Sequence, residues 1–319
     1  MKKTLPLALS FFIVSLTLSL FFVRMSASSE PPVLEWDRTY GGTGDEEARS
    51  LVQTVDGGYA FAGYATSFGA GDHDFWLVKI DTNGDMEWNR TYGGTGDEDA
   101  LSLVQTFDEG YALAGITDSF GAGGHDFWLV KTDADGNMKW NRTYGGANHE
   151  DAYSVVQTDD EGYAIIGRTW SFAIGLYDFW LVKTDANGDM EWNKTYGGVN
   201  HDWGYSVVQT NDGGYAIAGQ TRSFDAGNTE FWLVKTDADG NMEWDRTYGG
   251  ANPETPLSLV QTTDGGYAMA GHTTSFGAGS ADFWLVKTDA EGNHLWNQTY
   301  GGADWDEVYS LIQTVDGGY

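Results

Sequence analysis

The sequence contains no cysteine, so the chain can form no disulfide and offers no thiolate as a metal ligand or nucleophile. A lipid anchor attached through cysteine is excluded for the same reason. Proline is also scarce, with 5 residues against 44 glycines, which indicates many tight turns rather than a stiff proline-rich linker. Such a density of turns favours all-β structure.

Basic residues are few as well. There are 17 Lys and Arg against 47 Asp and Glu, which gives a formal net charge of −30. Nucleic-acid binding needs clustered Lys and Arg to neutralise phosphates, so no nucleic-acid partner is expected. Cations, basic surfaces and neutral ligands stay open as partners. Alternatively, the charge simply keeps an exposed, glycine-rich β protein soluble.

The N-terminal residues have the pattern of an export signal. Lys2 and Lys3 precede an uncharged stretch from Leu5 to Val23, and small residues follow around Ala27. The stretch is long enough to span a bilayer, so residues 1–27 are predicted to be a signal peptide or an N-terminal membrane anchor, followed by a short linker at 28–32. Both outcomes place the remainder outside the cytoplasmic membrane, secreted or at the cell surface, with membrane contact only through this segment.

Tryptophan recurs with a period of 52 residues and without any insertion or deletion. The first series begins each repeat and comprises Trp36, Trp88, Trp140, Trp192, Trp244 and Trp296. The second series lies within the motif FWLVK and comprises Trp76, Trp128, Trp180, Trp232 and Trp284. A strict internal period of this length is typical of repeat architectures.

Each repeat predicts four strands separated by turns. In the repeat that starts at Trp88 they are 87–94, 101–106, 111–117 and 126–133. The last of these, DFWLVKTD, is apolar on both faces, as expected of a strand held between neighbouring sheets. No stretch shows a sustained helical period.

These observations predict an all-β fold over residues 33–319. We expect a β-propeller of four-stranded blades, with five complete 52-residue repeats plus a partial sixth that ends at Tyr319. One blade cannot bury both of its apolar faces, so neighbouring blades supply the core, and the tryptophans are predicted to pack between them.

The repeated motifs W-x-R-T-Y-G-G, S-L-V-Q-T-x-D-G-G-Y-A, A-G-x-T-x-S-F and D-F-W-L-V-K-T-D-x-x-G resemble the propeller repeats of secreted and surface proteins of prokaryotes. The turn from FWLVKTDADG to the next Trp is also similar to the tryptophan-docking blades of quinoprotein-type propellers. The resemblance implies the blade scaffold alone. Some members of the surface group carry an endoglucanase label, but neither that chemistry nor a quinoprotein cofactor follows from it, and we assign no catalytic or cofactor-binding residue.

The two ends of the blades differ in sequence. Up-and-down strands place the turns DGG and ADG on one face and the longer, more variable loops on the other, where binding is expected. The lysine of each FWLVK motif is expected to pair with a repeated acid. Candidates for these acids include Asp74, Asp126, Asp178, Glu230 and Asp282.

One acid recurs on the variable face of every repeat. The six are Glu46, Glu98, Glu150, Asp202, Glu254 and Asp306. In a ring they would form a circle of carboxylates that could hold a hard cation such as calcium. The alternative is that each carboxylate accepts N–H bonds from its own loop.

Three tryptophans break the period and lie on or near the variable face. With four polar or aromatic neighbours they form a predicted binding platform for sugar or peptide, and ordinary drift among repeats is the alternative. The residues of this platform are Arg168, Trp170, Tyr177, Trp203, Arg222, His272 and Trp305.

The sequence therefore favours an exported or cell-surface propeller that acts as a non-catalytic binding or structural module, with carbohydrate or protein as partner. One alternative is a carbohydrate-active enzyme of the glycoside-hydrolase kind, which would need two carboxylates at a defined separation; every repeat offers similar acids, and no pair stands out. The other is a cation-binding component of a surface layer.

Overall fold

A computed structural model describes residues 36–224 and 228–319. The predicted leader, residues 1–27, and the linker, residues 28–32, lie outside the described residues. The chain divides into Met1–Asp37 and Arg38–Tyr319, and all the strands described below belong to the second unit. Across the described ranges, no helix has the length and apolar character needed to cross a membrane.

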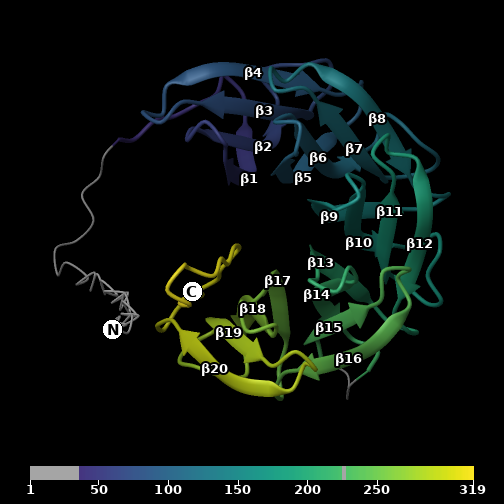
Figure 1. Cartoon of the computed structure of the whole chain (residues 1–319), viewed down its shortest axis with the longest axis vertical. Helices are drawn as coiled ribbons and strands as arrows, with labels where there is room; N and C mark the ends of the chain where they lie inside the picture. Colours follow the sequence, from purple (N-terminus) through teal and green to yellow (C-terminus); the bar gives the residue numbers. More distant parts are fainter. Residues whose placement is uncertain (1–35, 225–227) are drawn as a thin grey trace, which may run out of the picture. The chain divides into compact units, whose positions relative to one another are not determined.

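Among the described residues, twenty strands form five antiparallel four-stranded sheets, which we call blades 1 to 5 in chain order (Figure 1). Blade 1 contains β1 (Glu46–Gln53), β2 (Tyr59–Ala65), β3 (Asp74–Ile80) and β4 (Met86–Tyr92). Blade 2 contains β5 (Glu98–Gln105), β6 (Tyr111–Thr117), β7 (Asp126–Thr132) and β8 (Met138–Tyr144). Blade 3 contains β9 (Glu150–Gln157), β10 (Tyr163–Thr169), β11 (Asp178–Thr184) and β12 (Met190–Tyr196). Blade 4 contains β13 (Asp202–Gln209), β14 (Tyr215–Thr221), β15 (Glu230–Thr236) and β16 (Met242–Tyr248). Blade 5 contains β17 (Glu254–Gln261), β18 (Tyr267–Thr273), β19 (Asp282–Thr288) and β20 (His294–Tyr300).

The blades follow one another around a common centre, with the first strand of each blade innermost and the fourth outermost (Figure 1). Within a blade the strands run alternately up and down, so the β1–β2 and β3–β4 turns share one end, which we call the turn face. The β2–β3 loops and the connections between blades share the other end, the loop face. The predicted arrangement of turns and loops is therefore confirmed.

The innermost strands are longer than predicted because of a β-bulge. Strand β5 begins at Glu98 rather than at residue 101, and its pairing with β6 shifts register between Ala100 and Ser102. The extra residue interrupts the alternation of apolar and polar side chains. The sequence pattern therefore does not indicate that the residues before the bulge pair with β6. Gly115 makes the close approach possible, since a Cβ at that position would overlap the carbonyl oxygen of Asp99.

The core consists of four apolar layers, each between two neighbouring blades. Between blades 1 and 2, Phe75 and Leu77 of β3 meet Leu103, Leu113 and Trp128 of the next blade. The ring centroids of Phe75 and Trp128 lie 4.6 Å apart. The same contact recurs at each later junction, which confirms that the second tryptophan series packs between blades from Trp128 onward. Trp76 of blade 1 packs on Phe61 and Phe68 of its own blade.

The first tryptophan series packs against the turn face of the next blade. Trp88 lies edge-on to Tyr111, with ring centroids 5.8 Å apart, and covers the β7–β8 turn. In that turn Gly136 has a φ of 76°, and a Cβ there would come within 2.7 Å of the Trp88 indole. Glycine is therefore needed both for the left-handed backbone and for the space. The Tyr92 hydroxyl completes the junction by donating to the carbonyl of Gly136 at 2.6 Å.

Candidate functional site

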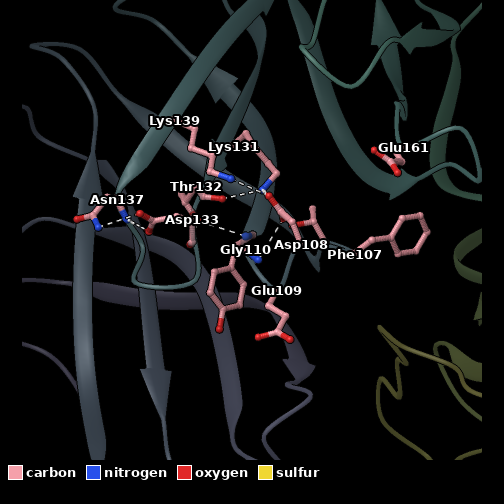
Figure 2. A network of polar contacts seen from close by, with 12 residues as sticks. Phe107, Asp108, Glu109, Gly110, Lys131, Thr132, Asp133, Asn137, Lys139 and Glu161 are labelled. Carbon is pink, nitrogen blue, oxygen red and sulfur yellow. Dashed lines mark hydrogen bonds and ion pairs between the residues drawn. The ribbon is translucent and has the colours of Figure 1, made fainter.

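The turn face is built from the same ion pairs in every blade. Lys131 of β7 donates to both carboxylate oxygens of Asp108, at 2.8 and 3.1 Å, and to the carbonyl of Thr132 (Figure 2). Lys139 reaches the same carboxylate at 2.8 Å. The equivalent pairs in the other blades are Lys79 with Asp56, Lys183 with Asp160, Lys235 with Asp212 and Lys287 with Asp264.

The prediction that these lysines pair with Asp126 and its equivalents is wrong. Asp126 starts β7 at the loop face, whereas Lys131 lies near the opposite end of the same strand. The Asp126 carboxylate instead accepts the Ala122 N–H of its own loop at 2.8 Å. The repeated lysines thus belong to the scaffold of the turn face.

The six predicted metal-ligating carboxylates lie at the loop face. Glu98 accepts the N–H of Gly94 at 2.7 Å, the Thr117 hydroxyl at 2.8 Å and the N–H of Ser119 at 3.1 Å. The other five carboxylates likewise accept the backbone N–H of the glycine four residues earlier, at 2.7–3.1 Å. They are Glu46, Glu150, Asp202, Glu254 and Asp306. Within residues 36–224 and 228–319, no three His, Asp or Glu side chains are grouped as a metal ion would need. Calcium binding stays a prediction.

A second carboxylate adjoins this acid at the blade junctions. Asp126 and Glu150 are both buried, and an oxygen of each converges on Gly145, where a Cβ would overlap Asp126 Oδ1. That oxygen has no hydrogen-bond partner among the described residues. Burial, and then the charge of Glu150, raises the pKa of Asp126 to about 6.

Four of the seven predicted ligand-binding residues gather at the loop face where blade 3 meets blade 4, with Trp203 on β13 of blade 4 and the other three on blade 3. The Arg168 guanidinium lies 4.6 Å from the ring centroid of Tyr177 and 4.4 Å from that of Trp203. Trp170 packs beside Tyr177, with centroids 5.8 Å apart. Asp151 fixes the arginine by accepting a 2.6 Å bond from its Nε. We call Arg168, Trp170, Tyr177 and Trp203 the blade 3 cluster.

Two polar atoms beside the cluster have no hydrogen-bond partner in the described part of the chain. These are Nε1 of Trp203 and Nδ1 of His201, and both atoms are buried. Burial, together with the nearby charges of Arg222 and Arg168, lowers the pKa of His201. His201 is therefore neutral near pH 7, and the charge of the cluster is that of the Arg168–Asp151 pair.

The other three predicted residues lie apart from the cluster or at its margin. Arg222 donates from Nε to the Thr229 hydroxyl at 2.8 Å, and its backbone N–H bonds to the carbonyl of His201. His272 and Trp305 form a separate pair, with ring centroids 5.0 Å apart, and Nδ1 of His272 lies 3.1 Å from Glu307. The seven residues are therefore not one platform.

The loop that carries the cluster differs from its counterparts. Residues 170–177 read WSFAIGLY, whereas the same loop reads TSFGAGDH in blade 1 and DSFGAGGH in blade 2. Ile174 is 78% exposed and Leu176 is 42% exposed, and the neighbouring Val199 is 70% exposed. The sequence analysis missed these three aliphatic residues. The signal that could have revealed them is the larger aliphatic side chain at fixed repeat positions, since blades 1 and 2 have Ala at the position of Ile174 and Asp or Gly at the position of Leu176.

A cavity of about 780 Å³ lies among the innermost strands. One repeat position contributes a different side chain to its wall from several blades, including Arg49, Leu101, Tyr153, Tyr205 and Leu257. The Tyr153 and Tyr205 rings touch, with centroids 5.2 Å apart, and the Arg168 guanidinium lies 5.9 Å from the Tyr153 ring. The blade 3 cluster therefore adjoins the wall of the cavity.

Among solved structures, the WD40 domain of Neurospora crassa Pan2 matches 79% of this chain and 66% of that chain, with a TM-score of 0.53 and 10% sequence identity. WD40 domains are propellers of four-stranded blades. The fold is a β-propeller. Puromycin hydrolase matches 79% of this chain and 39% of its own, with 14% identity, and its TM-score of 0.48 is too low to bear on chemistry.

The chain matches no protein-family model. A curated relative, the regulatory protein FlaEY of Caulobacter vibrioides, is 24% identical over 187 residues. That match spans 50% of this chain and only 20% of the relative. The propeller fold supports a binding or interaction module, since a rigid ring presents its loops on one face.

Proposed function

We propose that this chain is an extracytoplasmic, non-catalytic interaction module that binds a protein partner through the loop face of blade 3. The observation that carries the proposal is the exposed apolar loop 170–177, where Ile174 replaces the Ala and Leu176 the Asp or Gly of the equivalent loops of blades 1 and 2. Extracytoplasmic location rests on the N-terminal sequence alone.

Aliphatic exposure favours a protein or peptide over a sugar. Ile174, Leu176 and Val199 offer no flat ring on which a pyranose could stack, and none of their side chains can bond a hydroxyl group. A contiguous apolar patch beside a polar rim is typical of protein-binding surfaces. Trp170, at 45% exposure, adds an aromatic anchor of the kind found at binding hot spots.

The blade 3 cluster would hold this loop rigid. The Arg168 guanidinium packs on both the Tyr177 and the Trp203 ring and is hydrogen-bonded to Asp151, so the base of the loop is packed before any partner binds. A preorganised surface loses little conformational entropy on binding. The enzymatic and cation-binding alternatives stay hypotheses.

The test exchanges one loop for another from the same protein. In the variant, residues 170–177 are replaced by the blade 2 sequence of residues 118–125, which already folds on an equivalent blade. Purified residues 28–319 are used to select binders from a random peptide library displayed on phage and are applied in parallel to a glycan array. We expect selected peptides to bind the wild-type chain and to lose at least about tenfold in affinity for the loop variant, a change of about 1.4 kcal/mol.

Two point variants separate binding from folding. Ile174→Asp changes a well-exposed side chain of the loop and is expected to weaken the same peptides, whereas Phe107→Asp, on the exposed turn face, is expected to leave them unchanged. Peptides that bind the loop variant as well as the wild type, or ligands found only on the glycan array, would contradict the proposal.

A further inference from the structure

A surface pocket of about 470 Å³ opens on the turn face where blade 3 meets blade 4. Two aromatic rings line it, those of Trp192 and Tyr215, which meet edge to face with centroids 5.8 Å apart. The other walls carry mostly negative charge. The charged residues are Asp159, Asp160, Glu191, Asp239 and Lys183. Four carboxylates against one ammonium leave this pocket, which we call the acidic pocket, with an excess of negative charge.

The one lysine of the acidic pocket has no hydrogen left to donate to the remaining acids. Nζ of Lys183 donates to Asp160 at 2.7 Å, to Glu191 at 2.9 Å and to the carbonyl of Thr184 at 2.8 Å. All three ammonium hydrogens are therefore used. In the described part of the chain, Asp159 and Asp239 donate hydrogen bonds through their backbone N–H groups, while their exposed carboxylates accept none.

A buried phenol also lines the acidic pocket without a hydrogen-bond partner. Tyr215 is 1% exposed, yet its hydroxyl makes no hydrogen bond with any described residue. Burial raises the pKa of this hydroxyl, and the charges of Asp160, Glu191 and Asp159 raise it further, because these carboxylates lie around it. The hydroxyl therefore stays protonated near neutral pH, and its oxygen can accept a hydrogen bond from a ligand.

The equivalent pocket between blades 2 and 3 is smaller, at about 230 Å³, and carries less negative charge (Figure 2). There Phe107 takes the place of Asp159, and Lys139 takes the place of Glu191 and donates to Asp108 at 2.8 Å. Blades 1 and 4 have Val and Asn where blade 3 has Asp159. The complete acidic set is therefore a feature of one junction rather than of the repeated frame.

We propose that the acidic pocket binds an arginine side chain presented by a basic protein segment. A planar guanidinium can stack on Trp192, donate to the unpartnered carboxylates of Asp159 and Asp239, and donate to the Tyr215 hydroxyl. The ammonium of a lysine has no planar face to stack, so it fits less well. The net charge of −30 favours a basic partner as well. This site lies on the opposite face from loop 170–177 and goes beyond the function proposed above.

The test compares two peptides that differ in one charge. Residues 28–319 are titrated, at low ionic strength, with a short glycine and serine peptide that has one central arginine, and the Kd is measured by ligand-detected NMR. The matched peptide has citrulline, which keeps the shape of arginine but is neutral. We expect the arginine peptide to bind at least about fivefold more tightly. Equal affinities, or no binding of the arginine peptide, would overturn the proposal.

Charge-matched variants separate the acidic pocket from the general acidity of the turn face. Asp159→Asn with Glu191→Gln is expected to weaken the arginine peptide at least about fivefold, whereas Glu109→Gln with Asp135→Asn removes the same charge from exposed turns outside the pocket and is expected to leave it unchanged. Equal losses in the two variants would overturn the proposal. The loop 170–177 variant is expected to bind this peptide as the wild type does, so failure here is distinct from failure of the proposed function.

A second variant builds the same set of acids at the next junction. Phe107→Asp, Lys139→Glu and Asn187→Asp copy the acidic pocket into the place between blades 2 and 3. The arginine peptide, fitted with a benzophenone, is photo-crosslinked to each protein and the products are mapped by mass spectrometry. We expect crosslinks at 209–215 and 237–241 in the wild type, and additional crosslinks at 157–163 and 185–189 in the variant. Crosslinks on the loop face, or an unchanged pattern in the variant, would contradict the assignment.

Discussion

At the scale of single residues, the blade junctions hold an uncompensated charge. Asp126 and Glu150 approach each other in a buried position, and the described residues place no lysine or arginine beside the pair. One oxygen of Asp126 also lacks a hydrogen-bond partner among them. A buried carboxylate of this kind costs free energy when it is ionised.

We expect Asp126→Asn to stabilise the protein above pH 6. The pKa of Asp126 is about 6 in the folded chain and about 3.9 in an unfolded one, so the wild type loses stability relative to the variant as the pH rises from about 4 to about 6. After discounting for solvent screening, the gain is about 1 kcal/mol. The asparagine can still accept the Ala122 N–H and can donate to Glu150.

Urea unfolding at pH 4 and pH 8 measures this difference. The two proteins are expected to agree at pH 4 and to diverge at pH 8, while Asp135→Asn, in an exposed turn, is expected to have no effect at either pH. A destabilised variant at pH 8 would show that the ionised carboxylate has a compensating partner and that the charge at the junction is not a cost.

At the scale of the element, the tryptophan of the fourth strand is packed against a following blade in blade 2 but is partly exposed in blade 5. Trp140 packs on Tyr163 and on the turn at Gly188, while Trp296 of blade 5 is 41% exposed. We expect Trp140→Ala to lower the free energy of unfolding by about 2–4 kcal/mol and Trp296→Ala to lower it by less than about 1 kcal/mol. Equal losses, measured by thermal or chemical unfolding, would contradict the role of docking between blades.

The sequence predicts most strands because the same strand and turn motifs recur every 52 residues, so each blade supports the assignment made in the others. Strands such as β6 and β7 begin within one residue of their predicted starts, since turn residues bound them on both sides. The start of β5 was missed because a bulge breaks its alternation, and the partner of Lys131 was wrong because pairing depends on which end of β7 each group occupies. Both errors concern geometry that composition and spacing do not contain.

At the scale of the whole molecule, the strands and turns are nearly the same in every blade, whereas certain side chains near the loop face differ from blade to blade. The position of Arg168 is occupied by Tyr64, Ile116, Gln220 and His272 in the other blades, although all five lie at the same place on the second strand. The sequence marks such positions by their variation. It does not reveal that Arg168 meets Trp203 while His272 meets Trp305, because each partner lies outside the blade of the first residue, in the part of the chain that follows that blade.

The most direct test of binding at blade 3 is hydrogen exchange of residues 28–319, measured by mass spectrometry with and without a peptide selected from the library. If blade 3 carries the binding surface, exchange slows at 168–177 and 199–203 and is unchanged at 116–125, the matching loop of blade 2, and at the turn 106–110. Slowing at the turn face, or equally at the loops of all blades, would contradict a binding site on the loop face of blade 3.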